Sequence, residues 1–248
     1  MEKPPGFLIE LKVRNLDMLK KDLILRNPLR LLGQGDKGLL APGELGAILA
    51  RAGVGKTAFL VQLALSSLLN EKRVLHISLN DPVNKVTLWY EEVFRLIAGQ
   101  YNLLQINEIW DGILPNRFIM TFQVEGFNAP KLKERMTDLM AQGIFTPDMI
   151  IIDGLPFDDT TRVALTELKA LACAMKFPMW FTGRTHRHEV DIVNGLPLRI
   201  SEVSDLFDTI LQLQTEGSQI HICAIKGSAV PNPPLLLDPV TLLIQGGE

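Results

Sequence analysis

Residues 46–57 read Gly-Ala-Ile-Leu-Ala-Arg-Ala-Gly-Val-Gly-Lys-Thr, a short apolar run followed by a glycine-rich turn. The apolar run predicts a buried strand, and the apolar stretch 57–69 after the turn predicts a helix covered on nearly every side. A glycine-rich turn between a strand and a helix can bring successive backbone N–H groups around a phosphate. The amino end of the helix adds a dipole that favours an anion. This stretch therefore predicts a phosphate-binding site within an α/β fold.

The turn matches the phosphate-binding pattern Gly-x-x-x-x-Gly-Lys-Ser/Thr, except that Ala50 stands where the first glycine is usual. Lys56 is placed to reach the outer phosphates, and the hydroxyl of Thr57 can be a ligand of Mg²⁺. The alternative is an ordinary strand-to-helix turn that happens to contain a lysine. We expect a purine nucleoside triphosphate, with ATP favoured because the guanine signature Asn-Lys-x-Asp is absent. The expected nucleotide-binding residues in the loop are Ala52, Gly53, Val54, Gly55, Lys56, Thr57 and Ala58.

Asp153 ends the apolar run MIIID at 149–153. A carboxylate at the end of such a strand can hold a magnesium-bound water beside the phosphates. Taken alone, an aspartate at a strand end is more often a turn or cap residue. Together with the glycine-rich turn it predicts a magnesium site made by Thr57 and, through water, by Asp153.

Strands and helices alternate along most of the chain. The apolar patterns predict strands at 46–50, 73–79, 117–122, 149–153 and 178–182, and helices at 57–69, 83–97 and 161–176, with another helix that stops at Gly143. This alternation indicates a three-layer α/β fold in which helices cover both faces of a mainly parallel sheet. From Phe207 onward only strand-like runs follow, which predicts antiparallel strands that extend one edge of the sheet.

We divide the chain into an N-terminal helical extension at 1–37 and one nucleotide-binding domain at 38–248. Residues 7–32 have apolar residues at helical spacing, with a break near Pro28. This amphipathic segment either docks on a neighbouring copy or packs on its own chain.

Composition narrows the class of protein. With 248 residues, 47% of them hydrophobic, the chain can bury one sizeable core. Its net charge of −3 gives no general attraction to nucleic acid, which is therefore not a favoured partner. The first residues do not form a signal peptide and no apolar run approaches the length of a membrane span, so we expect a cytoplasmic protein without a membrane partner. Cys173 and Cys223 are expected to be buried, reduced thiols.

The segments LARAGVGKTAFLVQLAL, HISLNDP, DMIIIDGL, FTGRTHR and CAIKG occur in this order within residues 38–245. In order and spacing they resemble the RecA-like core of DnaB-type replicative helicases and KaiC-type ATPases. The resemblance implies ATP and Mg²⁺ as ligands and self-association into a homo-oligomer, with the nucleotide between subunits.

The chain departs from this resemblance at the residue that activates water. The family has a glutamate where this chain has Asn80, within Ser78-Leu79-Asn80-Asp81. An asparagine can hydrogen-bond a water but cannot accept its proton, and general-base help is worth about 10²–10⁴-fold in rate. Asp81 either takes over that role or, together with Pro82, marks the start of a helix. The expected catalytic residues are Lys56, Asn80, Asp81 and Asp153, and we expect hydrolysis to be slow.

Two further positions differ from the resembled families. Thr182-Gly183 stands where a Ser-Gln pair usually senses the outer phosphate, and Lys226-Gly227-Ser228 stands where Lys-x-Arg reaches the neighbour's nucleotide. Lys226 is therefore expected to bind nucleotide, whereas the arginine finger, worth about 10³–10⁵ in rate, is missing. Arg184 or Arg187 could substitute for it.

The loop 183–200 is locally basic and lies where RecA-like helicases contact single-stranded DNA. We interpret it as a solvated loop rather than a contact to nucleic acid or a protein partner, because it has no aromatic residues for base stacking. His186 and His188 with Asp191 make only a weak candidate for a metal site.

Three functions are compatible with these residues. The first is an ATP-binding protein with slow or weak ATPase activity that acts as a nucleotide-dependent switch or assembly protein. The second is a DNA-stimulated helicase or translocase, and the third is a scaffold that binds nucleotide without hydrolysing it.

Overall fold

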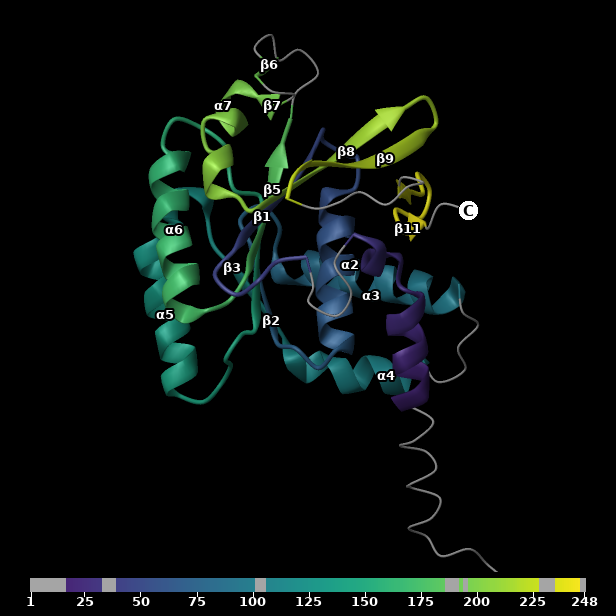
Figure 1. Cartoon of the computed structure of the whole chain (residues 1–248). Helices are drawn as coiled ribbons and strands as arrows, with labels where there is room; N and C mark the ends of the chain where they lie inside the picture. The colour runs from purple at the N-terminus through teal and green to yellow at the C-terminus, as the bar shows by residue number, and fades with distance from the viewer. Residues whose placement is uncertain are drawn as a thin grey trace, which may run out of the picture.

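The computed structural model describes residues 17–32, 39–100, 106–185, 192–193, 196–227 and 235–245. Within these residues the core is a nine-stranded sheet with the strand order β11-β10-β9-β8-β1-β5-β4-β2-β3 (Figure 1). The strands from β8 to β3 in this order are mutually parallel, whereas β9, β10 and β11 continue the β8 edge in antiparallel pairing. The prediction of an α/β fold with a mainly parallel sheet and antiparallel C-terminal strands is confirmed.

The strands of this sheet have the following bounds: β1 Leu45–Ala50, β2 Val74–Ser78, β3 Arg117–Thr121, β4 Met149–Asp153, β5 Met179–Arg184, β8 Thr209–Glu216, β9 Gln219–Lys226, β10 Leu236–Leu237 and β11 Ile244–Gln245. The α-helices are α2 Lys56–Leu69, α3 Val83–Gln100, α4 Ile106–Ile113, α5 Ala129–Ala141, α6 Thr161–Met175 and α7 Leu198–Ser201. A separate antiparallel pair joins β6 (Ile192–Val193) to β7 (Leu196–Pro197). The short helices α4 and α7 and the β6–β7 pair were not predicted from the sequence.

Helices cover both faces of the sheet, with α2, α3 and α4 on one face and α5 and α6 on the other (Figure 1). Each face has its own apolar cluster, one built around α2 and α3 and the other around α5 and α6. Side chains alternate between these clusters along each strand, as the period of two requires. In β5, for example, Trp180 packs in the α2 cluster and Phe181 packs in the α6 cluster.

The described part of the N-terminal segment packs on its own chain. Residues 17–26 are helical, and the 3-10 helix η1 (Pro28–Leu31) follows, capped by Asn27, whose Oδ1 accepts a hydrogen bond of 3.0 Å from the backbone N–H of Leu29. Leu23, Leu29 and Leu32 are buried in the same apolar cluster as α2. Of the two alternatives for residues 7–32, the structure thus shows internal packing for the described part; residues 7–16 lie outside the described residues.

The prediction of two buried thiols was wrong for Cys173. Its side chain is exposed on α6, because the helical period turns Leu165, Leu168 and Leu171 toward the sheet and Cys173 away from it. Cys223 is half-buried on β9, and this burial raises the pKa of its thiol. None of the helices in the described ranges has the length and hydropathy of a membrane-spanning segment.

Candidate functional site

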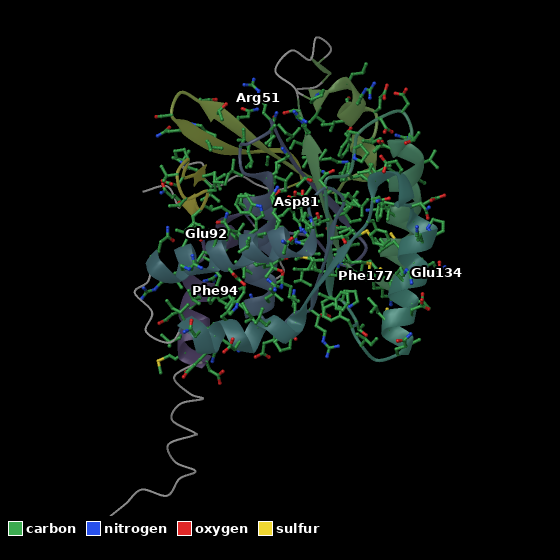
Figure 2. The ribbon with its side chains drawn as sticks, turned by 180° about the vertical axis from the view of Figure 1, so that it is seen from behind. Arg51, Asp81, Glu92, Phe94, Glu134 and Phe177 are labelled. Atoms are coloured by element: carbon green, nitrogen blue, oxygen red, sulfur yellow. The ribbon has the colours of Figure 1, made fainter. Side chains whose placement is uncertain are left out.

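The glycine-rich loop lies between the end of β1 and the start of α2, at the edge of the sheet where the parallel strands end. Strand register brings Ser78 at the end of β2 beside Asp153 at the end of β4, and pairs Ala50 of β1 with Arg184 of β5. In an open α/β sheet this carboxyl edge is where ligands usually bind. Arg51 projects from the loop at the surface of the molecule (Figure 2).

Two glycines give the loop a backbone conformation that other residues rarely adopt. Gly53 has φ of 79° and Gly55, the N-cap of α2, has φ of 101°. A Cβ atom added to Gly53 would meet no atom within 4 Å, so the surface there is open. At Gly55 the added atom would lie 3.0 Å from a methyl carbon of Leu237 and 3.2 Å from one of Leu242. The C-terminal strands thus pack directly against this end of the loop.

Lys56 is the first residue of α2, and its side chain folds back over the loop. Its Nζ atom donates hydrogen bonds of 3.0 Å to the carbonyl oxygens of Ala50 and Arg51. Partial burial lowers the pKa of Lys56, and the positive charge of Arg184 lowers it further, while the carboxylate of Asp153 acts in the opposite direction. The ammonium group is therefore close to both an acidic and a second basic side chain.

Asp153 is held by two hydroxyl groups. Thr57 donates a hydrogen bond of 2.8 Å to Oδ2 of Asp153, and Thr182 donates one of 2.6 Å to Oδ1. The backbone N–H of Gly154 donates to the Thr182 hydroxyl at 2.8 Å. These contacts join the first turn of α2 to the ends of β4 and β5.

The oxygen atoms of Thr57 and Asp153 fit a magnesium ion better than a softer metal. Mg²⁺ prefers oxygen ligands, and proteins usually bind it through one or two side chains while water and phosphate oxygens complete the shell. The described residues contain no group of three or more His, Cys, Asp and Glu that could enclose a metal by themselves. The paired hydroxyl and carboxylate beside an open loop therefore match an ion that is bound together with a phosphate ligand.

Asn80 and Asp81 follow the end of β2, which lies beside Asp153 of β4, and the two residues make different contacts. The amide of Asn80 covers Gly154, where an added Cβ atom would lie only 2.1 Å from the Asn80 nitrogen. Asp81 makes an ion pair of 2.8 Å with Lys85, and its backbone N–H donates to the Ser78 hydroxyl at 3.0 Å. The helix α3 begins at Val83, so Asp81 and Pro82 lie directly before its first turn, as the helix-start interpretation of these two residues requires.

Lys226 is not brought to the loop within one chain. It pairs in register with Ile210, which lies beside Ala47 of β1, well before the strand reaches the loop. Its Nζ atom donates a hydrogen bond of 3.0 Å to the carbonyl oxygen of Ser204, and the side chain is exposed. Ser228 and residues 186–191 of the basic loop, including the weak candidates for a metal site, lie outside the described residues.

Two residues near the loop were singled out from the sequence only indirectly, Thr182 at the position of a phosphate sensor and Arg184 as a substitute for the arginine finger. Thr182 holds Asp153, and Arg184 lies on the same face of β5, because residues two apart in a strand point the same way. That face is the one that carries α2 and Lys56. No acidic partner of Arg184 occurs within the described ranges. The sequence signal for both residues was their position at the end of the strand after Asp153.

Comparison with known protein families finds no match for this chain, and comparison with curated proteins finds none either. The class of the protein is therefore stated from its structure alone: it has a mixed α/β fold with a mainly parallel sheet.

Proposed function

We propose that this chain is a RecA-like P-loop protein that binds Mg-ATP, hydrolyses it slowly, and acts as a nucleotide-dependent switch or assembly protein. The observation that carries the proposal is the hydrogen-bonded contact between Thr57 and Asp153 directly beside Lys56. A hydroxyl and a carboxylate that are 96 residues apart in the sequence meet at the start of a helix, next to a glycine-rich loop. That combination serves the binding of a phosphate and its magnesium ion.

Each residue has a defined role in this proposal. The backbone N–H groups of the loop 50–57 would surround the phosphates, and Lys56 would exchange its carbonyl partners for phosphate oxygens. Thr57 would bind the magnesium ion directly, and Asp153 would bind it through water. The bound ion neutralises phosphate charge. Thr182 is a positioning residue, because it fixes the orientation of the Asp153 carboxylate.

Slow hydrolysis follows from the residues around the expected position of the attacking water. Asn80 lies beside Asp153-Gly154, where it could orient a water but could not take its proton. Asp81 is the carboxylate that directly follows Asn80 in the sequence, and it forms an ion pair with Lys85. To act as a base, Asp81 would have to leave this partly exposed ion pair, and it would still have to reach the attacking water.

Arg184 supplies positive charge from within the same chain. It stands beside Lys56 on the α2 face of the sheet. Two cations near each other are stabilised when an anion binds between them. Lys226, exposed on β9, would remain available to the nucleotide of a neighbouring copy if the chain forms a homo-oligomer.

The test combines a nucleotide-binding titration with a phosphate-release assay in Mg-ATP, with and without single-stranded DNA. The variant is Lys56→Ala, and Lys133→Ala on the exposed side of α5 is the matched control. We expect binding that depends on Lys56 and not on Lys133, with slow release of phosphate. Gel filtration with and without nucleotide then tests whether nucleotide changes the association of the chain.

Other results would support other functions. Turnover that DNA accelerates and Lys56→Ala abolishes would identify a motor. Binding without release and without any change in association would identify a scaffold. No binding of ATP, or equal binding by Lys56→Ala, would refute the proposal.

A further inference from the structure

A cavity of about 650 Å³ lies at the opposite edge of the sheet from the glycine-rich loop. Its walls come from the amino ends of β1, β4 and β5, from the carboxyl ends of α2 and α6, and from η1. The volume is within the range of sites for small molecules, about 300–1,000 Å³. Nothing in the proposed nucleotide site uses these residues.

The fully buried part of the cavity lining is apolar, and the half-buried Ser66 and Ser67 of α2 add hydroxyl groups to it. Its buried lining residues are Leu29, Leu40, Leu63, Pro147, Met149 and Trp180. Trp180 is packed against Gly46, where an added Cβ atom would lie 2.5 Å from its ring, so the indole is fixed in place. A fixed aromatic ring with aliphatic and methionine neighbours suits an apolar group.

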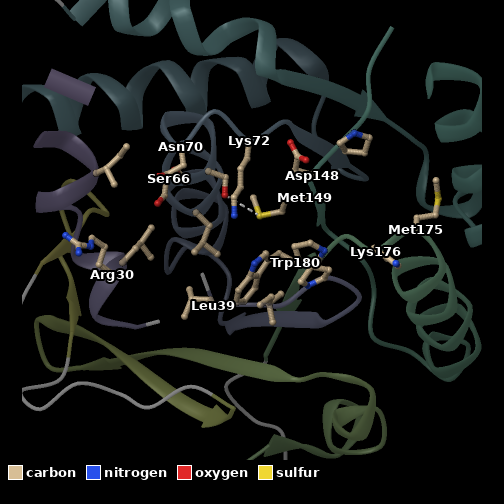
Figure 3. Close-up of a pocket in the computed structure, with 18 residues that line it drawn as sticks. Arg30, Leu39, Ser66, Asn70, Lys72, Asp148, Met149, Met175, Lys176 and Trp180 are labelled. Carbon is tan, nitrogen blue, oxygen red and sulfur yellow. Dashed lines mark hydrogen bonds between the residues drawn. The ribbon is translucent and has the colours of Figure 1, made fainter. Parts of the chain in front are cut away.

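The rim carries more positive than negative charge. Arg30, Lys72 and Lys176 are exposed at the rim, whereas Asp148 is its acidic residue. The Asp148 carboxylate accepts a hydrogen bond of 2.7 Å from the backbone N–H of Arg73. Neither Lys72 nor Lys176 has an acidic partner within the described ranges. Arg30 and Lys176 flank the cavity with Trp180 between them, and Lys72 extends toward Met149 (Figure 3).

The helix ends reduce this positive charge but do not cancel it. The carboxyl ends of α2 and α6 face the cavity, and each carries roughly half a negative charge. Together they offset about one of the two excess positive charges at the rim. The remainder is about one positive charge above an apolar interior, which matches a ligand with one negative charge.

We propose that this cavity binds a small apolar monocarboxylate, with its apolar body against Trp180 and its carboxylate beside Lys72, while Arg30 and Lys176 add positive charge on either side of the cavity. The proposal does not depend on nucleotide binding. It commits to a monoanion, because the rim charge after the helix ends are counted is too small for a polyphosphate. It also commits to an apolar body, because the fully buried lining residues around Trp180 are all apolar.

The test uses a fluorescent fatty acid, 11-(dansylamino)undecanoate, and its methyl ester, which has the same body without the charge. We expect saturable binding of the acid and clearly weaker binding of the ester. Lys72→Met should weaken binding of the acid by about fivefold, which is the most that an exposed ion pair contributes, and should leave the ester unchanged. Lys133→Met on α5 is the control for a general loss of positive charge.

A second variant locates the site. Ser66→Trp replaces a half-buried lining residue of α2 with a side chain that fills the cavity, and it should abolish binding of both the acid and the ester. Unchanged unfolding midpoints show that both variants are folded; if Ser66→Trp does not fold, Lys72→Met decides the question alone. Equal affinities for acid and ester, equal losses in Lys72→Met and Lys133→Met, or unchanged binding by a folded Ser66→Trp would overturn the proposal.

Discussion

The contact between Gly154 and Asn80 gives the sharpest quantitative prediction. Gly154 has φ of 94°, and a Cβ atom there would lie 2.1 Å from the Asn80 amide nitrogen. Gly154→Ala should therefore lose about 1–2 kcal/mol to backbone strain and roughly another 1–3 kcal/mol to the clash. Urea unfolding measures the total as a loss in the free energy of unfolding, with an unchanged slope against urea concentration.

Two comparisons separate the strain from the clash. Gly217→Ala has φ of 60° and no atom within 4 Å of the added carbon, so it should lose the strain alone. In the double variant Gly154→Ala/Asn80→Ala, the nearest remaining atom of residue 80 is Cβ at 3.6 Å, an ordinary contact, and the clash should disappear. Equal losses in Gly154→Ala and Gly217→Ala, or no recovery in the double variant, would show that Asn80 does not lie over Gly154.

Three further predictions concern the pH dependence of stability, the C-terminal strands and the nucleotide site. Burial holds the pKa of His76 at about 4, below its ordinary value of 6.5. Protons therefore bind preferentially to the unfolded chain, so stability should be full above about pH 6.5 and fall by roughly 3 kcal/mol toward pH 4. In His76→Leu, the free energy of unfolding measured with urea should fall less between pH 6.5 and pH 4. An equally large fall in the variant would show that His76 is not the group responsible. The buried Gln62 side chain donates to the Leu242 carbonyl at 2.8 Å and accepts from the Ile244 N–H at 2.9 Å. Gln62→Ala should lose about 2–4 kcal/mol and speed hydrogen exchange at the Ile244 amide; slow exchange there would show that β11 is held by other contacts. Arg184→Gln should weaken ATP binding about tenfold, as expected for a charged hydrogen bond to phosphate, without lowering the unfolding midpoint. Arg135→Gln on α5 serves as its control, and equal affinities of the two variants would remove Arg184 from the nucleotide site.

Most of the sheet could be predicted because its signals are local. Apolar runs such as MIIID at 149–153 are long enough to identify a buried strand, and β4 has these same bounds. The helices α2, α3 and α6 were predicted within a few residues for the same reason. The eight-residue helix α4 was not predicted, because about two turns are shorter than the stretch of about 11–18 residues over which a helical period is recognised, although Ile109 and Ile113 do lie on one buried face.

The candidate site was only partly predictable. Lys56 and Asp153 were expected from a motif and from a strand ending, and the structure brings them near each other. The roles of Thr182 and Gly154 depend on strand register, because Thr182 reaches Asp153 only when β4 and β5 are neighbours. The exposure of Cys173 likewise depends on which face of α6 meets the sheet.

The sequence by itself determined the alternation of strands and helices, the glycine-rich loop and the apolar end of β4, since each is a pattern within a few neighbouring residues. The tertiary structure decided the strand order, the hydroxyl contacts of Asp153 and the position of Lys226 away from the loop. It also decided the cavity beneath Trp180, whose walls come from segments far apart in the chain. The physical reason is that local sequence sets backbone conformation and the direction in which side chains alternate, whereas contacts between distant residues arise only when the packed layers fix the strand register.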